Sequence, residues 1–180
     1  MAKTFQQQLI DAVNAKNSSL DPALTVDDVT FGAVSEATPS GDSDTRNSKI
    51  TLTAKAESEH YKGEKEFHYT RLVSQSLITL TEVTAETTEV EDSVIIAKLN
   101  EDMVAKGYTD DEFKAEELTI QKADAGDGNF NYTVSVKDGH IKFLAGQIAV
   151  YTYKKPAPEK VALNGLESEL DGFTAPSVGG

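Results

Sequence analysis

The chain has 180 residues, of which 38% are hydrophobic and 7% aromatic, so its length suits one large domain or two small ones with thin cores. The formal net charge is -13 and most of it lies after residue 80, which argues against nucleic acid as a partner because polyanions would be repelled. The sequence has no cysteine, which excludes disulfides and cysteine-ligated zinc, and it has neither the apolar run of a signal peptide nor a membrane-spanning segment. We therefore expect a soluble protein that is used without secretion.

The first half of the chain begins with a helical pattern and continues with strand patterns. Apolar residues from Phe5 to Val13 recur at helical spacing, and Asp21-Pro22 favours a turn after them. Alternating apolar residues on both sides of Gly63 indicate an antiparallel pair of strands with one wet face. The predicted elements are a helix over about residues 4–16, a short strand within residues 25–31, an exposed polar loop over residues 35–48, and paired strands at residues 49–54 and 66–72.

The second half follows a similar order of patterns. Residues 73–92 start with a β-branched stretch that could form a strand, and they end as an acidic, threonine-rich linker. Helical spacing returns at Val94, and Gly107 is a plausible C-terminal cap. The predicted elements are a helix over about residues 92–105, strands at residues 117–120, at residues 132–136 and within residues 141–153, and a turn or loop at residues 124–129.

The two halves also align with each other, which suggests an internal duplication. The offset is 86 residues in the helix, 89 in the first strand and 82 in the hairpin, while Gly63 and Gly146 miss this last register by one residue. Any two α+β segments share some alternation and a glycine turn, so chance similarity is the alternative. The matched groups are Leu9-Ile10 and Val13-Asn14 with Ile95-Ile96 and Leu99-Asn100, Val29 and Phe31 with Leu118 and Ile120, Ile50-Thr51-Leu52 with Tyr132-Thr133-Val134, and Tyr69-Thr70 with Tyr151-Thr152.

The sequence therefore predicts an α+β fold. Its expected architecture is a tandem duplication of a unit made of one helix plus a three-stranded antiparallel sheet, with an extended C-terminal arm. The expected domains are a first α+β repeat at residues 1–80, an acidic linker at residues 81–92, a second α+β repeat at residues 93–155 and the extended arm at residues 156–180.

The sequence contains no recognisable catalytic pattern. There is no serine-nucleophile, phosphate-binding or HExxH motif, so we expect a non-enzymatic protein without a metal or another cofactor. The histidines His60, His68 and His140 are interpreted as solvated or strand-edge residues. The acidic loops at residues 42–44 and 124–129 offer the oxygen ligands that calcium prefers, but neither has the full ligand series of an EF-hand, and solvated turns are favoured.

The C-terminal segment, residues 156–180, is rich in proline and ends in two glycines. It cannot extend a sheet in the usual way because proline lacks the N–H donor of the ladder. Its regularly placed apolar residues exceed what a solvating tail requires, so we favour an arm that docks on a neighbouring subunit over a disordered tail. The residues predicted to anchor this arm are Val161, Leu163, Leu166, Leu170 and Phe173.

Three short segments carry a resemblance to a known class of proteins: Arg46-Asn-Ser-Lys-Ile-Thr-Leu-Thr-Ala54, Tyr61-Lys-Gly63 and Phe67-His-Tyr69-Thr-Arg71-Leu72. They are similar to a pattern in small virion structural proteins of large tailed bacteriophages. The resemblance covers about residues 5–72 and, more weakly, the second half, where Tyr153 stands in place of the arginine. It implies a non-enzymatic component of a capsid, tail or baseplate surface.

These observations lead to a functional expectation with two alternatives. We expect an outer capsid component of the decoration type, attached in many copies, with the major capsid protein, tail proteins or the chain itself as partners and with neither nucleic acid nor membrane. The expected location is the virion, after synthesis in the host cytoplasm. A tail or baseplate component is the alternative in the same class. A carbohydrate- or receptor-binding module is the alternative in another class, and it would require Tyr61, Tyr69, Tyr151 and Tyr153 to be exposed and to stack on sugars.

Overall fold

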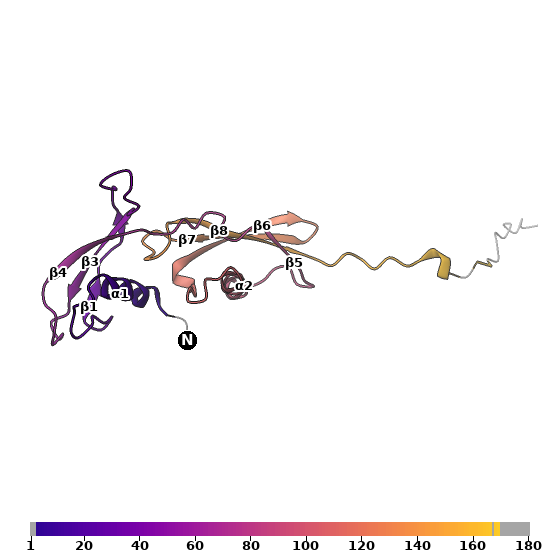
Figure 1. Ribbon diagram of the computed structural model, residues 1–180. Coiled ribbons are helices and arrows are strands. Elements are labelled where there is room, and N and C mark those ends of the chain that lie inside the picture. Colours follow the sequence, from indigo (N-terminus) through magenta and orange to yellow (C-terminus); the bar gives the residue numbers. More distant parts are fainter. Residues whose placement is uncertain (1–2, 167, 170–180) are drawn as a thin grey trace, which may run out of the picture.

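The structure of the chain is a computed structural model that describes residues 3–166 and 168–169. In these residues the fold is α+β, with two helices and two sheets, and each helix covers one face of one sheet (Figure 1). We call residues 4–71 the N-terminal unit and residues 72–154 the C-terminal unit. The elements are α1 (Phe5–Lys16), β1 (Val29–Phe31), β2 (Ser35–Glu36), β3 (Ser48–Ala54), β4 (Glu64–Tyr69), β5 (Thr81–Thr84), α2 (Asp92–Ala105), η1 (Ala115–Glu117), β6 (Leu118–Gly126), β7 (Asn129–Val136), β8 (Gly146–Lys154) and η2 (Leu163–Gly165).

Both helices form where the sequence predicts them. The Thr4 Oγ1 atom accepts a hydrogen bond from the Gln7 N–H at 3.1 Å, which caps the start of α1. The α2 helix is followed by Gly107, whose φ of 94° is favourable only for glycine and stops the helix. Each helix buries one apolar stripe against its sheet. The predicted helices at residues 4–16 and 92–105 are confirmed.

The N-terminal sheet is built on β3. One side of β3 pairs with β4 and the other side pairs with β1 and β2, and all these pairs are antiparallel. Ile50 and Leu52 of β3 are buried in a cluster with Leu9, Ile10 and Val13 of α1. The predicted hairpin of β3 and β4 is thus confirmed, and in the described residues β4 is an edge strand because β3 is its sole partner.

The C-terminal sheet has the order β5-β8-β7-β6. The last three strands are antiparallel to their neighbours, whereas β5 lies parallel to β8, with Thr81 opposite Tyr151 and Val83 opposite Tyr153. The acidic composition of residues 81–92 predicts a linker, but the structure places β5 at the start of this range. The strand is held by its ladder with β8 and by Val83 packing against the core, and local composition reveals neither contact.

Two loops also differ from the sequence-based expectation. The β6 strand continues to Gly126, so the acidic loop predicted at residues 124–129 is mainly the end of the β6–β7 hairpin. Asp127 and Gly128 form its turn, with φ values of 55° and 72°. The loop predicted at residues 35–48 contains the short strand β2. In both places, pairing with a neighbouring strand organises polar residues that have no apolar pattern of their own.

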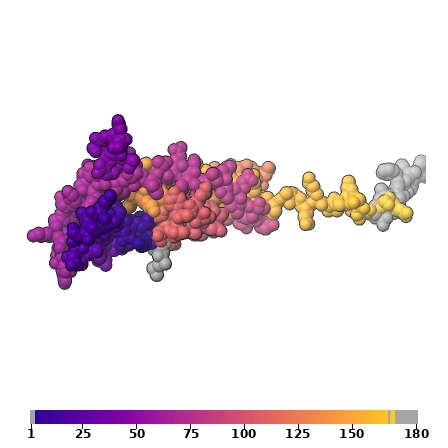
Figure 2. All heavy atoms as spheres, in the orientation of Figure 1, coloured from indigo at the N-terminus to yellow at the C-terminus, as the bar shows by residue number. Residues whose placement is uncertain are grey.

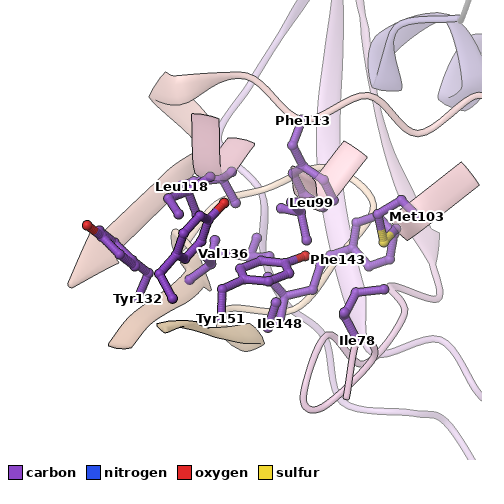
Figure 3. Close-up of a cluster of buried hydrophobic side chains, with 14 of the residues drawn as sticks. Ile78, Leu99, Met103, Phe113, Leu118, Tyr132, Val136, Phe143, Ile148 and Tyr151 are labelled. Atoms are coloured by element: carbon purple, nitrogen blue, oxygen red, sulfur yellow. The ribbon is translucent and has the colours of Figure 1, made fainter. Parts of the chain in front are cut away.

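The larger core lies between α2 and the C-terminal sheet (Figure 3). Tyr132, Phe143 and Tyr151 are fully buried there, together with Leu99 of α2. Phe5 of α1 belongs to this same cluster although it comes from the N-terminal unit. The two units are therefore joined by shared burial of apolar surface as well as by the chain.

The two units have corresponding strand orders and registers. Each has a helix followed by three strands that pair in sequence order, β1-β3-β4 and β6-β7-β8. Val29 lies opposite Ala54 in the first sheet, and Leu118 lies opposite Val136 in the second. These two pairs are related by the offsets of 89 and 82 residues that the sequence alignment uses.

The last strands require a different offset from the aligned sequences. Phe67 lies opposite Ile50, and Tyr151 lies opposite Tyr132, so the offset between β4 and β8 is 84 residues here and not 82. A bulge in the β7–β8 ladder, where Ile148 is the extra residue of β8, reduces the offset to 83 on its other side. Tyr69 thus corresponds to Tyr153, and the predicted match of Tyr69-Thr70 with Tyr151-Thr152 is two residues out of register.

Candidate functional site

A cavity of about 590 Å³ opens at the junction of the two units. Its walls come from the start of α1, from the segment after β1, from η1 and from the turn between β7 and β8. It is the natural place to look for chemistry, because groups from distant parts of the chain meet there. The polar and charged side chains in its wall are Gln6, Glu116, Glu117, Lys137, Asp138 and His140.

His140 is the buried titratable residue of this cavity. Its side chain is 2% exposed and lies among the rings of Phe5, Phe113 and Phe143, with centroid distances of 4.4, 5.4 and 5.5 Å. The sequence-based interpretation of His140 as a solvated or edge residue is wrong, because aromatic side chains from both units enclose the ring. Burial lowers the pKa of His140 to about 4, so the ring is neutral at neutral pH.

The hydrogen bonds of His140 determine its tautomer. Its Nδ1 atom accepts hydrogen bonds from the backbone N–H groups of Lys142 and Phe143, each at 3.1 Å. The proton of the neutral ring is therefore on Nε2. This Nε2 atom has no hydrogen-bond partner among the described residues, and the nearest carboxylate oxygen, Oε1 of Glu117, is 3.8 Å away. The ring fastens the backbone of the β7–β8 connection through Nδ1.

A buried ion pair lies beside this ring. The Asp111 side chain is 1% exposed, and its two oxygens accept hydrogen bonds from the Lys142 ammonium at 2.6 and 2.7 Å. Gln8 of α1 joins both groups, because its Nε2 donates to Asp111 at 3.0 Å and its Oε1 accepts from Lys142 at 2.8 Å. The three side chains connect α1, the loop after α2 and the β7–β8 connection, so the pair locks the junction of the units.

The stretch from Tyr69 to Leu72 forms the other half of the junction. The Tyr69 hydroxyl donates to the Ile141 carbonyl at 2.8 Å. Arg71 is buried, and its guanidinium donates to Ser48 Oγ at 2.6 Å and to the His140 carbonyl at 3.3 Å. These contacts assign the tyrosine and the arginine of this stretch to the joining of two units, and none of them places a reactive group at an open surface.

The acidic loops of the sequence analysis do not converge on a common point. Asp44 is paired with Arg46 at 2.6 Å and accepts hydrogen bonds from Ser40, and the adjacent guanidinium lowers the pKa of Asp44. Asp124 accepts the N–H of Gly126 at 2.7 Å. Across residues 3–166 and 168–169, no group of three or more histidine and acidic side chains is arranged to hold a metal ion.

The tyrosines predicted for sugar stacking are not all available. Tyr151 and Tyr153 are buried, at 0% and 4% exposure, and the Tyr151 hydroxyl donates to Asp102 at 2.9 Å. Tyr61 and Tyr69 are half-buried, and their hydroxyls donate to the carbonyls of Pro22 and Ile141. The premise of four exposed tyrosines is therefore wrong for Tyr151 and Tyr153, because α2 covers the face of the sheet that carries them.

The sequence matches the model of a family of unknown function, DUF7941, over residues 1–177. The chain belongs to this family. No curated protein and no solved structure matched the chain. Within the described residues, no helix is long and apolar enough to cross a membrane. For this family member, a functional proposal rests on the surfaces of the fold and on its charge.

One such surface is the outer edge of β4 in the N-terminal unit. A cavity of about 270 Å³ lies beside it, between the end of α1 and the start of β4. Leu20, at 36% exposure, borders this cavity without being buried by another element. The apolar residues of its wall are Val13, Leu20, Leu24, Val29, Leu52 and Phe67.

The second surface is the chain that follows β8. Residues 155–166 run away from the two sheets, from the end of the molecule opposite to β4 (Figures 1 and 2). Three of the predicted anchors lie here with high exposure, Val161 at 75%, Leu163 at 81% and Leu166 at 55%. The other two, Leu170 and Phe173, lie outside the described residues. The exposed apolar residues of this segment have no function in the fold of the single chain, and the sequence alone predicts them.

Proposed function

We propose that this protein is a non-enzymatic structural component of a tailed-phage virion, attached in many copies to the outer surface of the capsid. The observation that carries the proposal is the separation of the chain into an acidic folded body and a segment with three exposed apolar anchors, Val161, Leu163 and Leu166. Exposed apolar side chains in regular succession favour a contact with another protein over solvation.

The titratable groups of the junction support an architectural function. His140 is neutral and enclosed, Asp111 is paired with Lys142, and Arg71 bonds to Ser48 and a carbonyl. Each of these groups is used to connect the two units. The resemblance of residues 5–72 to small phage virion proteins supports the same conclusion, and the net charge of -13 favours the outside of a particle over contact with packaged DNA.

We further propose that the two units arose by tandem duplication. The support is the common order of a helix and three strands, the matching pairs Val29–Ala54 and Leu118–Val136, and the glycines at the start of the last strand. Gly63 and Gly146, which begin β4 and β8, correspond at the offset of 83 residues that holds before the bulge. An experimental structure in which residues 5–72 and 94–153 fail to superpose in this register would contradict the proposal.

Cosedimentation tests the proposed function. The purified chain is mixed separately with intact particles, isolated capsids and isolated tails of the phage that encodes it, and bound protein is measured after pelleting. Saturable binding to particles and capsids, but not to tails, is the expected result. Binding to tails alone would replace the capsid proposal with the tail or baseplate alternative, and binding to neither would refute both.

The matched variant ends at residue 155, after β8, and leaves the two units intact. We expect it to lose at least tenfold in affinity for capsids because the anchors at residues 161–166 are gone. Full occupancy by the truncated chain would show that the folded body alone attaches the protein.

A further inference from the structure

The chain that follows β4 adds itself to the sheet of the C-terminal unit. The Ser76 N–H donates to the Gln147 carbonyl at 3.1 Å, and the Ile78 N–H donates to the Ile148 carbonyl at 3.0 Å, before β5 pairs with β8. The Ile78 side chain is 4% exposed and lies on the Met103 side of the core (Figure 3). The edge of β8 is thus closed by a strand, and the groove beside it is filled by an isoleucine.

The N-terminal unit has the same edge without such a segment in the described residues. Its edge strand is β4, and the cavity of about 270 Å³ lies beside it. By the register of the two units, the bulge residue Ile148 falls between Glu64 and Lys65, while Met103 corresponds to Asn17. Glu64, Lys65 and Asn17 all line this cavity. The cavity is therefore at the place that corresponds to the position of Ile78.

The chain that follows β8 has the apolar spacing needed to fill this place. Since β8 corresponds to β4, the segment after β8 corresponds to the segment after β4. Ile78, Leu80 and Val83 in the first of these segments are matched by Val161, Leu163 and Leu166 in the second, each 83 residues later. In the single chain the side chains of the second set are all more than half exposed.

We propose that residues 161–166 of one copy add a parallel strand to the free edge of β4 in a second copy, with Val161 entering the cavity beside Phe67. This inference rests on the duplication and the docking segment of the proposed function. Strand addition satisfies the open N–H and C=O groups of an edge strand, and side chains that enter pockets supply the specificity. The chain cannot fold this segment back onto its own β4, because the segment leaves the molecule at the opposite end (Figure 1).

The charges of the two surfaces permit this contact. Residues 155–166 contain Lys155, Lys160 and Glu159, so they are the basic part of a strongly acidic chain. The receiving strand begins with Glu64 and carries Glu66, so the donated segment meets net negative charge. The interface joins two different surfaces and is heterologous, and it therefore produces open chains or closed rings of copies.

A thiol cross-link tests the register directly, because the protein has no cysteine of its own. The pair Glu82–Thr152 of the β5–β8 ladder corresponds to Gly165 of one copy and His68 of another. The full-length variants Gly165→Cys and His68→Cys are mixed in equal amounts and oxidised. We expect a disulfide-linked dimer of the two unlike chains at a yield at least tenfold above that of the control pair, since neighbouring strands bring α-carbons within disulfide range.

The control pair is Gly165→Cys with Glu101→Cys, because Glu101 has a 73% exposed side chain on α2, away from the β4 edge. Equal yields from the two mixtures would overturn the inference. Adding Val161→Asp to the Gly165→Cys chain should lower the yield severalfold without affecting the fold, since Val161 is exposed in the single chain. An unchanged yield from this double variant would also overturn it.

The same chains separate this inference from the proposed function. Binding to capsids without the specific cross-link, in solution or on the particle, overturns the strand donation and leaves the virion proposal standing. The specific cross-link without any binding to particles supports the strand donation and refutes the virion proposal.

Discussion

Asn14 and Asn100 make the same pair of hydrogen bonds in the two units. The Asn14 side chain donates to the Leu24 carbonyl at 2.8 Å and accepts from the Leu24 N–H at 3.0 Å. The Asn100 side chain donates to the Phe113 carbonyl at 3.0 Å and accepts from the Phe113 N–H at 2.8 Å. Each amide thus holds the loop that leads from its helix into the first strand of its sheet.

Replacing either asparagine with alanine should destabilise the protein to a similar extent. Each change leaves a backbone N–H and a carbonyl without their partner, and we expect a loss of about 1–3 kcal/mol in the free energy of unfolding. Urea denaturation followed by circular dichroism measures the loss, with the exposed Asn164→Ala as the control. A large loss for Asn14→Ala and none for Asn100→Ala would contradict the equivalence of the two units.

Breaking the buried ion pair at the junction should be costly. Asp111→Asn removes a charge that is 1% exposed and leaves the Lys142 ammonium with an amide, for an expected loss of about 2–4 kcal/mol. In a double-mutant cycle with Lys142→Met, the coupling energy should exceed about 1 kcal/mol. The exposed pair Lys3–Asp11, at 2.7 Å, is the control, and its coupling should stay below about 1 kcal/mol. Equal coupling in the two pairs would refute the distinction.

The stability of the protein should fall below pH 6.5 because of His140. The pKa of this ring is lowered from 6.5 to about 4 in the fold, so in this range the unfolded chain binds a proton that the folded chain excludes. Linkage then predicts that stability is complete above pH 6.5 and declines towards pH 4, by up to about 3 kcal/mol. The free energy of unfolding measured by urea at several pH values tests this.

The variant His140→Asn isolates this effect, because it keeps an acceptor for the backbone N–H groups and cannot titrate. Its stability should decline less than that of the wild type between pH 6.5 and pH 4. Burial raises the pKa of Glu117, which makes an opposite contribution in both proteins and cancels in the comparison. Parallel pH profiles of the two proteins would contradict the prediction. His68→Asn, at an exposed position, should match the wild type.

The glycines that begin the last strands should resist substitution. Gly63 has a φ of 80° and Gly146 a φ of 143°, and side chains rarely adopt either conformation. We expect Gly63→Ala and Gly146→Ala each to cost about 1–3 kcal/mol. Gly41→Ala is the matched control, since the added methyl group meets no atom within 4 Å and φ is not in the left-handed region. A loss no larger than that of the control would refute the assignment.

Local periodicity was sufficient to predict the helices and the antiparallel hairpins. Apolar residues spaced for a helix, as from Phe5 to Val13, or alternating as from Ile50 to Leu52, record which face meets the core. The sequence also aligns Asn14 with Asn100, although it does not reveal what their amides bind. These predictions succeed because the pattern and the contact are both local.

The remaining features depend on contacts between distant residues. The β5 strand pairs with residues about seventy positions later, and its own four residues have no distinctive alternation. His140 follows a turn and looks exposed, but Phe5 of the first helix and Phe113 cover it. The two-residue error in the match of Tyr69 with Tyr153 arose from a bulge, which changes the register without an apolar signature. The junction and the free edge of β4 could not be predicted for the same reason.

The position of β8 has a mechanical consequence. This strand leads directly into residues 155–166 and is bordered by β5 on one side and β7 on the other. Tension on the C-terminal segment would act along β8, so the hydrogen bonds of both ladders would be loaded together in shear and would not open one after another. A protein held by that segment would therefore resist pulling at the strand that is most firmly embedded in its fold.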